Sequence, residues 1–349
     1  KEPIIEEEKD YPCKYIDPKT NNGYLFKITY FENKINIDIF HALTDGNTGT
    51  TFFREIIYNY LELYYPNELK QENRQLRKID FDTEDSYIKN YDKRAKSNAS
   101  GKRAYELKGR KIKLGAVSVI HEIINLESLK IESKKYDATI TQYLTAVLMY
   151  SIYKENYIKN KGKKPIKICI PVNLKRYFSS KTMTNFFSYI TLVAQIEKDK
   201  LNTFEKMISF VKKEFKNRLN EEEIIKTMST NVKIGNNLIV RTIPLFLKKI
   251  LVRLSYLEIR KYTTITFSNI GRVGIIGEYK KYIDYFLMLI APEPVEKIKC
   301  SSCTFENNMV FTFTSILGNN KIEKAFYNFL KEREIQVKIE SNGVLDDIS

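Results

Sequence analysis

One histidine stands at a position where its side chain can act as a base. His41 follows Ile35, Ile37 and Ile39 at a spacing of two, so a strand would direct its ring to the same, inward face. It comes at the end of that strand, just before a turn. Because an imidazole ordinarily titrates near neutral pH, this placement predicts a general base.

Two further residues complete a short motif with this histidine. Asp45 follows His41 by four positions and Gly46 comes next. Asp45 can fix the loop by pairing with a cation, and Gly46 permits a tight turn or a close backbone approach at the entrance of a helix. The other histidine of the chain, His121, lies within an apolar strand pattern, so we expect it to be satisfied by a hydrogen bond in the core or at a sheet edge.

The cysteines do not form a recognisable metal site. The chain has 4 cysteines, and Cys300 and Cys303 form a C-x-x-C pair without a second pair or a nearby histidine. The pair lies in a segment, 298–305, that has the pattern of a strand rather than the helix start of a thioredoxin-type site. We therefore expect reduced thiols, no metal and a cytoplasmic protein.

The chain is strongly basic, with a net charge of +15 from 58 Lys and Arg against 43 Asp and Glu. Such a charge favours nucleic acid, a membrane surface or a phosphate-bearing cofactor. The densest basic stretch, 89–113, contains Ser, Asn and Gly residues, and we expect it to be an exposed loop. It carries no zinc finger, RNP motif, Walker A or G-x-G-x-x-G pattern, so we expect no nucleic-acid partner.

The pattern of apolar residues indicates helices and strands mixed in both halves of the chain, as in an α/β or α+β protein. A stretch at 160–165 resembles a hinge, which places a lobe boundary between 164 and 165. The pattern predicts strands over 24–40 (a hairpin), 115–124, 166–172, 187–196, 262–268, 283–291, 298–317 (a hairpin) and 335–341, and helices over 46–65, 126–135, 140–157, 202–218, 222–230, 237–260 and 319–332.

The segment 238–257 is apolar with basic residues interspersed, among them Lys248, Lys249 and Arg253. Basic amphipathic helices can lie on anionic lipid. Apolar stripes at helical spacing more often mark a core face, so we expect this helix to pack on the second lobe and do not expect a membrane-surface partner. No stretch approaches 18 uncharged apolar residues, which argues against a membrane span.

The motif His41-x-x-x-Asp45-Gly46 resembles the HHxxxDG signature of the chloramphenicol acetyltransferase-like superfamily. This group includes condensation domains, wax ester synthases and alcohol acetyltransferases. The segment 170–176 resembles the group's PVNLR element, 182–187 resembles the stretch that follows it, and 267–271 resembles its SN(V/I)G turn. Phe40 replaces the first histidine of the signature, and Lys175, with Arg176 beside it, stands where an arginine is usual.

The resemblance implies two α/β lobes in a V with a tunnel between them. The lobes would span 1–164 and 165–349, and the first would lack its N-terminal segment. The catalytic site would comprise His41 as general base, Asp45 as a structural residue and Gly46. Ser268, Asn269 or Asn185 would bind the oxyanion or substrate, although Asn185 could equally be a turn or tunnel residue. Lys175 or Arg176 would pair with Asp45.

The function implied by the resemblance is transfer of an acyl group from acyl-CoA, such as acetyl-CoA, to a small alcohol or amine. The acyl-CoA is a co-substrate, and no permanently bound cofactor is expected. Two alternatives stay open: a condensation-like enzyme that uses thioesters bound to a carrier protein, and a binding protein that kept the fold without activity. Only Phe40 and Lys175 favour the last alternative.

Overall fold

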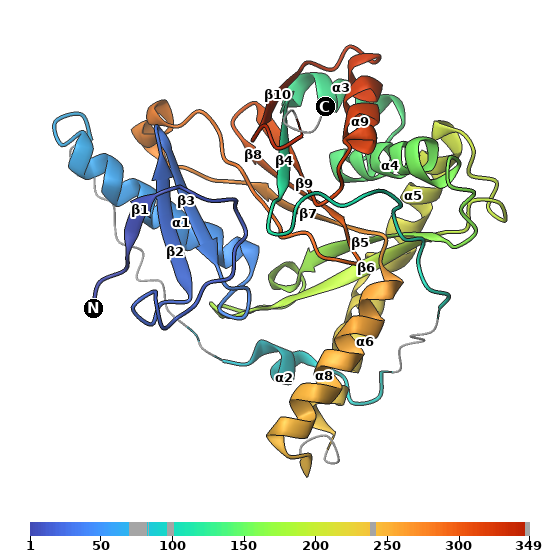
Figure 1. Cartoon of the computed structure of the whole chain (residues 1–349), viewed down its shortest axis with the longest axis horizontal. Coiled ribbons are helices and arrows are strands. Elements are labelled where there is room, and N and C mark those ends of the chain that lie inside the picture. Colours follow the sequence, from blue (N-terminus) through green and yellow to red (C-terminus); the bar gives the residue numbers. More distant parts are fainter. Residues whose placement is uncertain (70–81, 83, 96–100, 238–241, 346–349) are drawn as a thin grey trace.

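The computed structural model describes residues 1–69, 82, 84–95, 101–237 and 242–345 as a mixed α/β protein with two separate sheets (Figure 1). A three-stranded sheet lies beside a larger body built on a seven-stranded sheet. The mixture of helices and strands predicted from the sequence is confirmed.

The small sheet contains the predicted hairpin. Strands β2 (Phe26–Phe31) and β3 (Lys34–Ile39) pair antiparallel, and β1 (Ile5–Glu7) adds a parallel edge strand that the sequence pattern did not indicate. The chain then enters helix α1 (Gly46–Tyr64), which ends just before Pro66, as predicted.

The large sheet has the strand order β10-β4-β9-β8-β7-β5-β6. Its β4 lies before the expected lobe boundary at 164, yet it pairs with β9 and β10 near the end of the chain. The sheet therefore combines segments from both sides of that boundary. Its strands are β4 (Ser118–Asn125), β5 (Ile166–Asn173), β6 (Phe187–Ala194), β7 (Ile265–Arg272), β8 (Ile298–Phe305), β9 (Asn308–Ser315) and β10 (Val337–Ser341).

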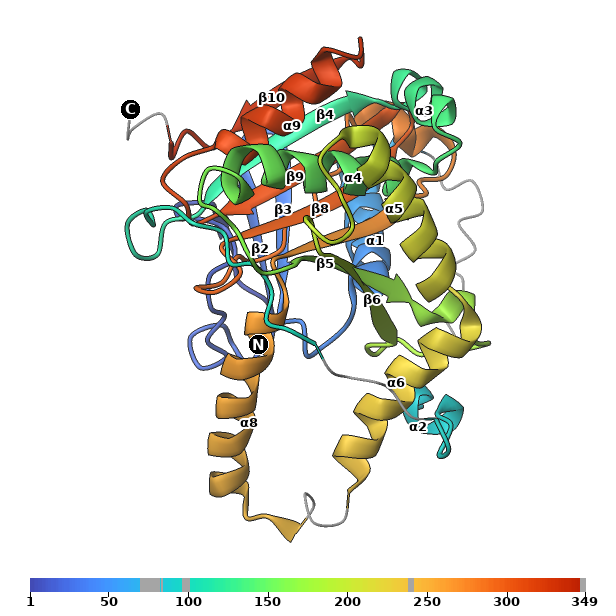
Figure 2. The ribbon, with the colours of Figure 1, turned by 90° about the vertical axis from the view of Figure 1, so that its right-hand side faces the viewer.

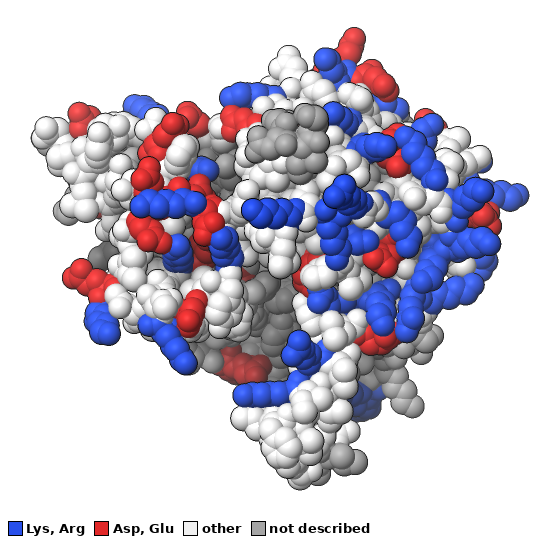
Figure 3. Space-filling view, viewed as in Figure 1, with Lys and Arg blue, Asp and Glu red and all other residues white. Residues whose placement is uncertain are grey.

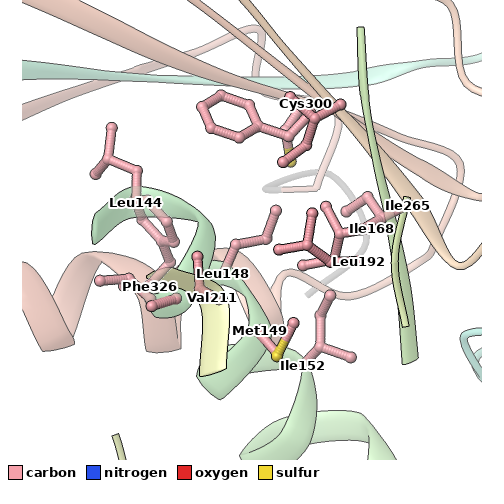
Figure 4. Packing of buried hydrophobic residues seen from close by; sticks show 14 of the residues in the cluster. Leu144, Leu148, Met149, Ile152, Ile168, Leu192, Val211, Ile265, Cys300 and Phe326 are labelled. Carbon is pink, nitrogen blue, oxygen red and sulfur yellow. The ribbon is translucent and has the colours of Figure 1, made fainter. Parts of the chain in front are cut away.

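Helices cover one face of the large sheet and enclose the main core (Figure 2). Helix α4 contributes Leu144, Leu148 and Met149, which pack against apolar side chains from strands β5 to β8 (Figure 4). The covering helices are α3 (Leu126–Lys135), α4 (Ile140–Ile152), continued by η1 (Tyr153–Tyr157), α5 (Phe204–Arg218) and α9 (Lys321–Lys331). The other elements are the long helix α6 (Glu221–Asn236) and the short ones α2 (Ser86–Asn90), η2 (Leu174–Arg176), η3 (Arg260–Tyr262) and η4 (Gly277–Tyr282).

Helix α1 attaches the small sheet to the larger body. Its Ile57, Tyr58 and Leu61 are buried in a second apolar cluster together with Val273 and Phe286 from the segment after β7. Other aromatic residues of α1 stay exposed: Phe52 is 40%, Tyr60 47% and Tyr64 64% exposed. These aromatic side chains flank the contact with the body rather than forming it.

Three sequence-based expectations are wrong. The segment 283–291 forms no strand, although Phe286 within it is buried against α1. The basic stretch 89–113 is not simply an exposed loop: within its described part, Tyr105 and Leu107 are buried in the main core. The remainder of that stretch, 96–100, lies outside the described residues.

The third wrong expectation concerns helix α8 (Leu245–Ile259), which does not pack its apolar stripe on the body. None of its residues is buried, and it extends away from the large sheet (Figures 1 and 2). Throughout the described ranges, every helix is too short or too polar to span a lipid bilayer.

Candidate active site

The motif residues lie in the loop between β3 and α1. The backbone N–H of Phe40 donates to the carbonyl of Leu25 at 2.9 Å, which extends the hairpin by one residue and holds His41 at its end. Asp45 is the N-cap of α1, and its Oδ1 accepts a hydrogen bond from the backbone N–H of Thr48 at 3.0 Å. An aspartate is favoured here because its carboxylate satisfies an amide that has no partner within the helix.

The same loop is held against a segment about 140 residues further along the chain. Asn185 donates from Nδ2 to the backbone carbonyl of His41 at 2.8 Å, and Thr44 donates from Oγ1 to the carbonyl of Met183 at 2.8 Å. The backbone N–H of Phe186 donates to Oδ2 of Asp45 at 3.2 Å. These three contacts fix the loop that bears His41 to the residues that lead into β6.

His41 is exposed at the wall of a cavity of about 2540 Å³. Residues of the small sheet and α1 line one side of this cavity, and residues of β5, β7 and the segment 281–291 line the other. The His41 ring lies 5.4 Å from the ring of Phe187, measured between centroids. The imidazole is therefore packed on one side and open to the cavity on the other.

Ser268 and Asn269 lie on the opposite side of the same cavity, in β7. Asn269 donates from Nδ2 to the hydroxyl of Thr141 at 3.0 Å and accepts from the backbone N–H of Gly271 at 2.8 Å. The pairing of β7 with β8 becomes irregular between Asn269 and Arg272, and Gly271 adopts φ +81°. A bulge of this kind redirects side chains at a sheet edge, and a glycine accommodates the positive φ.

Gly46 lies where α1 approaches β7. A Cβ atom at this position would come within 3.3 Å of Ile270 Cγ2 and 3.4 Å of Met288 Cε. The absence of a side chain therefore permits the close approach that was expected at the helix entrance.

The two cationic residues near the motif make different contacts. Lys175 donates from Nζ to Thr48 Oγ1 at 2.8 Å, one turn inside α1, and Arg176 is exposed and lines the cavity. The contacts that the structure describes for the Asp45 carboxylate are with backbone amides, not with either cation. Asn185, expected to bind substrate or line a tunnel, is not among the residues that line the cavity, and its side chain contacts the His41 carbonyl instead.

His121 also lines the cavity, and its Nδ1 is 2.8 Å from the hydroxyl of Thr312 on β9. The predicted hydrogen-bonded histidine is confirmed. Burial lowers the pKa of His121 to about 4, opposed by the carboxylate of Glu340. This histidine is accordingly neutral at pH 7.

All four cysteines are free thiols, and Cys300 and Cys303 are buried. Cys300 and Cys303 lie in β8 as predicted, and burial raises the pKa of Cys303 to about 12. Its Sγ donates to the carbonyl of Phe286 at 3.0 Å. Across the part of the chain that the structure describes, no group of three or more His, Cys, Asp or Glu side chains is arranged to hold a metal ion.

The match to a family model identifies the chain as an acyltransferase, the class that the resemblance implied. Residues 97–282 match the alcohol acetyltransferase family, so the chain belongs to that family. The matched residues include the Asn185, Ser268 and Asn269 positions and begin after His41. No curated protein sequence matches the chain.

Solved structures share the fold at low sequence identity. An F. sporotrichioides protein crystallised with coenzyme A and T-2 is 9% identical with a TM-score of 0.53, over 90% of this chain and 69% of that one. Polyketide synthase associated protein 5 from Mycobacterium tuberculosis is 9% identical with a TM-score of 0.52, over 94% and 79%. Vinorine synthase is 13% identical with a TM-score of 0.51, over 90% and 66%.

Proposed function

We propose that the chain transfers an acyl group from acyl-CoA to a small alcohol, with His41 as the general base. One observation carries the proposal. The loop that bears His41 is fixed through its backbone, by Asn185 and by Asp45, while the imidazole itself stays open to a large cavity. A histidine held in this way is available to a substrate and is not engaged in stabilising the fold.

The reaction needs no covalent acyl-enzyme, since the thioester is already activated. The imidazole of His41 takes the proton of the acceptor O–H while the oxygen attacks the thioester carbonyl carbon. The tetrahedral intermediate then collapses with cleavage of the C–S bond, and the proton on His41 passes to the leaving sulfur. The products are an ester and free CoA thiol, and binding both substrates in one cavity supplies much of the rate.

The intermediate carries a negative oxygen that requires a donor. Ser268 is our first candidate, because its side chain lies half-buried on the cavity wall opposite the small sheet. Asn269 has one amide hydrogen committed to Thr141, which leaves the second for the oxyanion. The contact with Thr141 also fixes the orientation of the amide.

The donor is proposed to be CoA-bound because the cavity wall includes the exposed Arg176, whose guanidinium suits a CoA phosphate. The F. sporotrichioides protein of the same fold was crystallised with coenzyme A. No permanently bound cofactor takes part in the proposed reaction.

Thiol release from acetyl-CoA and longer acyl-CoAs, with a panel of alcohols and amines, tests the proposal. We expect acceptor-dependent release that falls by about 100-fold or more in His41→Ala, the usual range for loss of a general base. His121→Gln is the matched variant, since it changes the only other histidine of the chain. It should lose far less activity than His41→Ala.

Three results would contradict the proposal. Turnover that is unchanged in His41→Ala would exclude this histidine as the base. Folded protein that releases no thiol from acyl-CoA but transfers acyl groups from a carrier protein would favour the condensation-like alternative. Absence of transfer from either donor would favour a binding protein.

A further inference from the structure

Helix α8 presents an unusually apolar surface to solvent. Six apolar residues of α8 form one stripe at helical spacing, and each is between 43% and 66% exposed. They are Phe246, Leu247, Ile250, Leu251, Leu254 and Leu257. Burying a single large apolar side chain is worth about 2 kcal/mol, so leaving six of them in water is costly. An exposed apolar patch of this kind marks an interaction surface.

The C-terminal end of α8 is fastened to the body. Arg103 donates from Nη2 to Glu258 Oε1 at 2.7 Å, and Tyr256 donates from its hydroxyl to Glu293 Oε2 at 2.7 Å. Arg260, just after the helix, contacts the same Glu293 oxygen at 2.6 Å. The helix is therefore held at its base while its first turns extend away from the body (Figure 2).

The charges on α8 indicate what covers the stripe. Lys248, Lys249 and Arg253 lie on the opposite side of the helix from the stripe or at its edges. The one acidic residue, Glu258, is already paired with Arg103 and Lys261. In the space-filling view the extending helix is largely uncharged, with basic side chains beside it (Figure 3).

From these contacts we infer that α8 docks on an anionic lipid surface. A lipid leaflet offers acyl chains to the stripe and negative headgroups to Lys248, Lys249 and Arg253. A second copy of the chain would bring the same basic residues together and repel them. At 15 residues, or roughly 22 Å, the helix is too short to cross the bilayer and of a suitable length to lie in its interface.

The chain contains no tryptophan, so a single introduced tryptophan reports on one position. We would compare Phe246→Trp on the stripe with Ile131→Trp on α3, whose native side chains are 66% and 63% exposed. Vesicles of phosphatidylcholine with phosphatidylglycerol should shift the emission of Phe246→Trp to shorter wavelength and leave Ile131→Trp unchanged. Vesicles of phosphatidylcholine alone should have a much smaller effect.

Co-sedimentation with the anionic vesicles measures how much the apolar stripe and the basic residues of α8 each contribute to binding. The double variant Ile250→Gln, Leu254→Gln should bind at least tenfold more weakly, because it removes apolar area without changing charge. Lys248→Gln and Lys249→Gln should each cost about fivefold. The single variant Lys134→Gln on α3, which makes the same change of charge at another exposed position, should bind as the parent chain does.

The inference is overturned if the parent chain does not bind the anionic vesicles, or if both tryptophans respond alike. It is also overturned if sedimentation velocity shows that the parent chain is a dimer and that the Ile250→Gln, Leu254→Gln variant is a monomer, while neither protein binds vesicles. That last result would assign the stripe to a second copy of the chain. None of these measurements depends on acyltransferase activity.

Discussion

Asn185 donates a hydrogen bond from its side-chain amide to the backbone carbonyl of His41, with an N···O distance of 2.8 Å. The two residues are 144 positions apart in the chain. Because the bond goes to the backbone, it holds the loop without occupying the imidazole. We propose that Asn185 acts on the reaction through the position of His41.

Replacing Asn185 should therefore lower kcat more than it raises KM. In Asn185→Ala we expect kcat to fall by roughly five- to tenfold, the equivalent of one lost hydrogen bond, while KM for both substrates changes little. Asn185→Asp should behave similarly, because a carboxylate keeps the size and loses the donor. Steady-state kinetics with a melting curve for each variant provide the measurement, and equal effects on kcat and KM would argue against positioning.

Asp45 should contribute to stability through two amides. Its carboxylate caps α1 through Thr48 and accepts from the Phe186 amide, and the side chain is only 6% exposed. We expect Asp45→Ala to lower the free energy of unfolding by about 3 kcal/mol. Asp45→Asn should cost less, since asparagine still caps a helix but offers one acceptor oxygen. Urea denaturation measures both, and a loss under about 0.5 kcal/mol in the alanine variant would contradict the assignment.

Gly271 and Gly235 differ in backbone conformation, so the same change to alanine should have opposite effects on stability at the two positions. Gly271 has φ +81° in the irregular part of β7, whereas Gly235 lies in α6, where an added Cβ atom would meet nothing within 4 Å. Gly271→Ala should destabilise the chain by roughly 1–2 kcal/mol, because alanine is strained at positive φ. Gly235→Ala should instead stabilise it by up to about 1 kcal/mol. Thermal unfolding distinguishes the two, and destabilisation of equal size would refute the argument.

Two buried carboxyl groups should make stability depend on pH. Glu122 on β4 and Glu323 on α9 are 0% and 2% exposed, and no hydrogen-bond partner for either carboxylate is found within the described ranges. Burial raises the pKa of Glu323 from its ordinary 4.5 to about 7. Burial, with the charge of Glu323, raises the pKa of Glu122.

The sign of the effect follows from the raised pKa. Below pH 4.5 Glu323 is protonated in both the folded and the unfolded chain, so its contribution to the free energy of unfolding is fully present. That stability is lost as the pH rises through about 7, the pKa in the folded chain. Glu323→Gln should make the fall in the free energy of unfolding over this pH range smaller, by at most about 3 kcal/mol. Denaturation at a series of pH values measures it, with the exposed Glu332→Gln as control. A parent chain whose stability does not fall between pH 5 and 8 would be inconsistent with two buried carboxyls.

Local patterns predicted much of the fold because they depend on neighbours in the sequence. The hairpin β2–β3, the helix ended by Pro66 and the strands around Cys300 were all indicated by periodicity and turn residues. The segment 283–291 shows the limit of this reasoning. Its apolar residues have the composition of a strand, but Phe286 is buried by packing against α1 without strand pairing.

The sequence by itself determined which residues can carry the chemistry: the motif of His41, Asp45 and Gly46, and the downstream segments that resemble the family. Only the tertiary structure decided how they are held, because the hydrogen bonds from Asn185 and Phe186 join residues more than 140 positions apart. It also left α8 exposed, although its amphipathic pattern predicted a packed helix. A pattern shows that an apolar face must be covered, and the identity of the covering surface depends on contacts that the pattern does not contain.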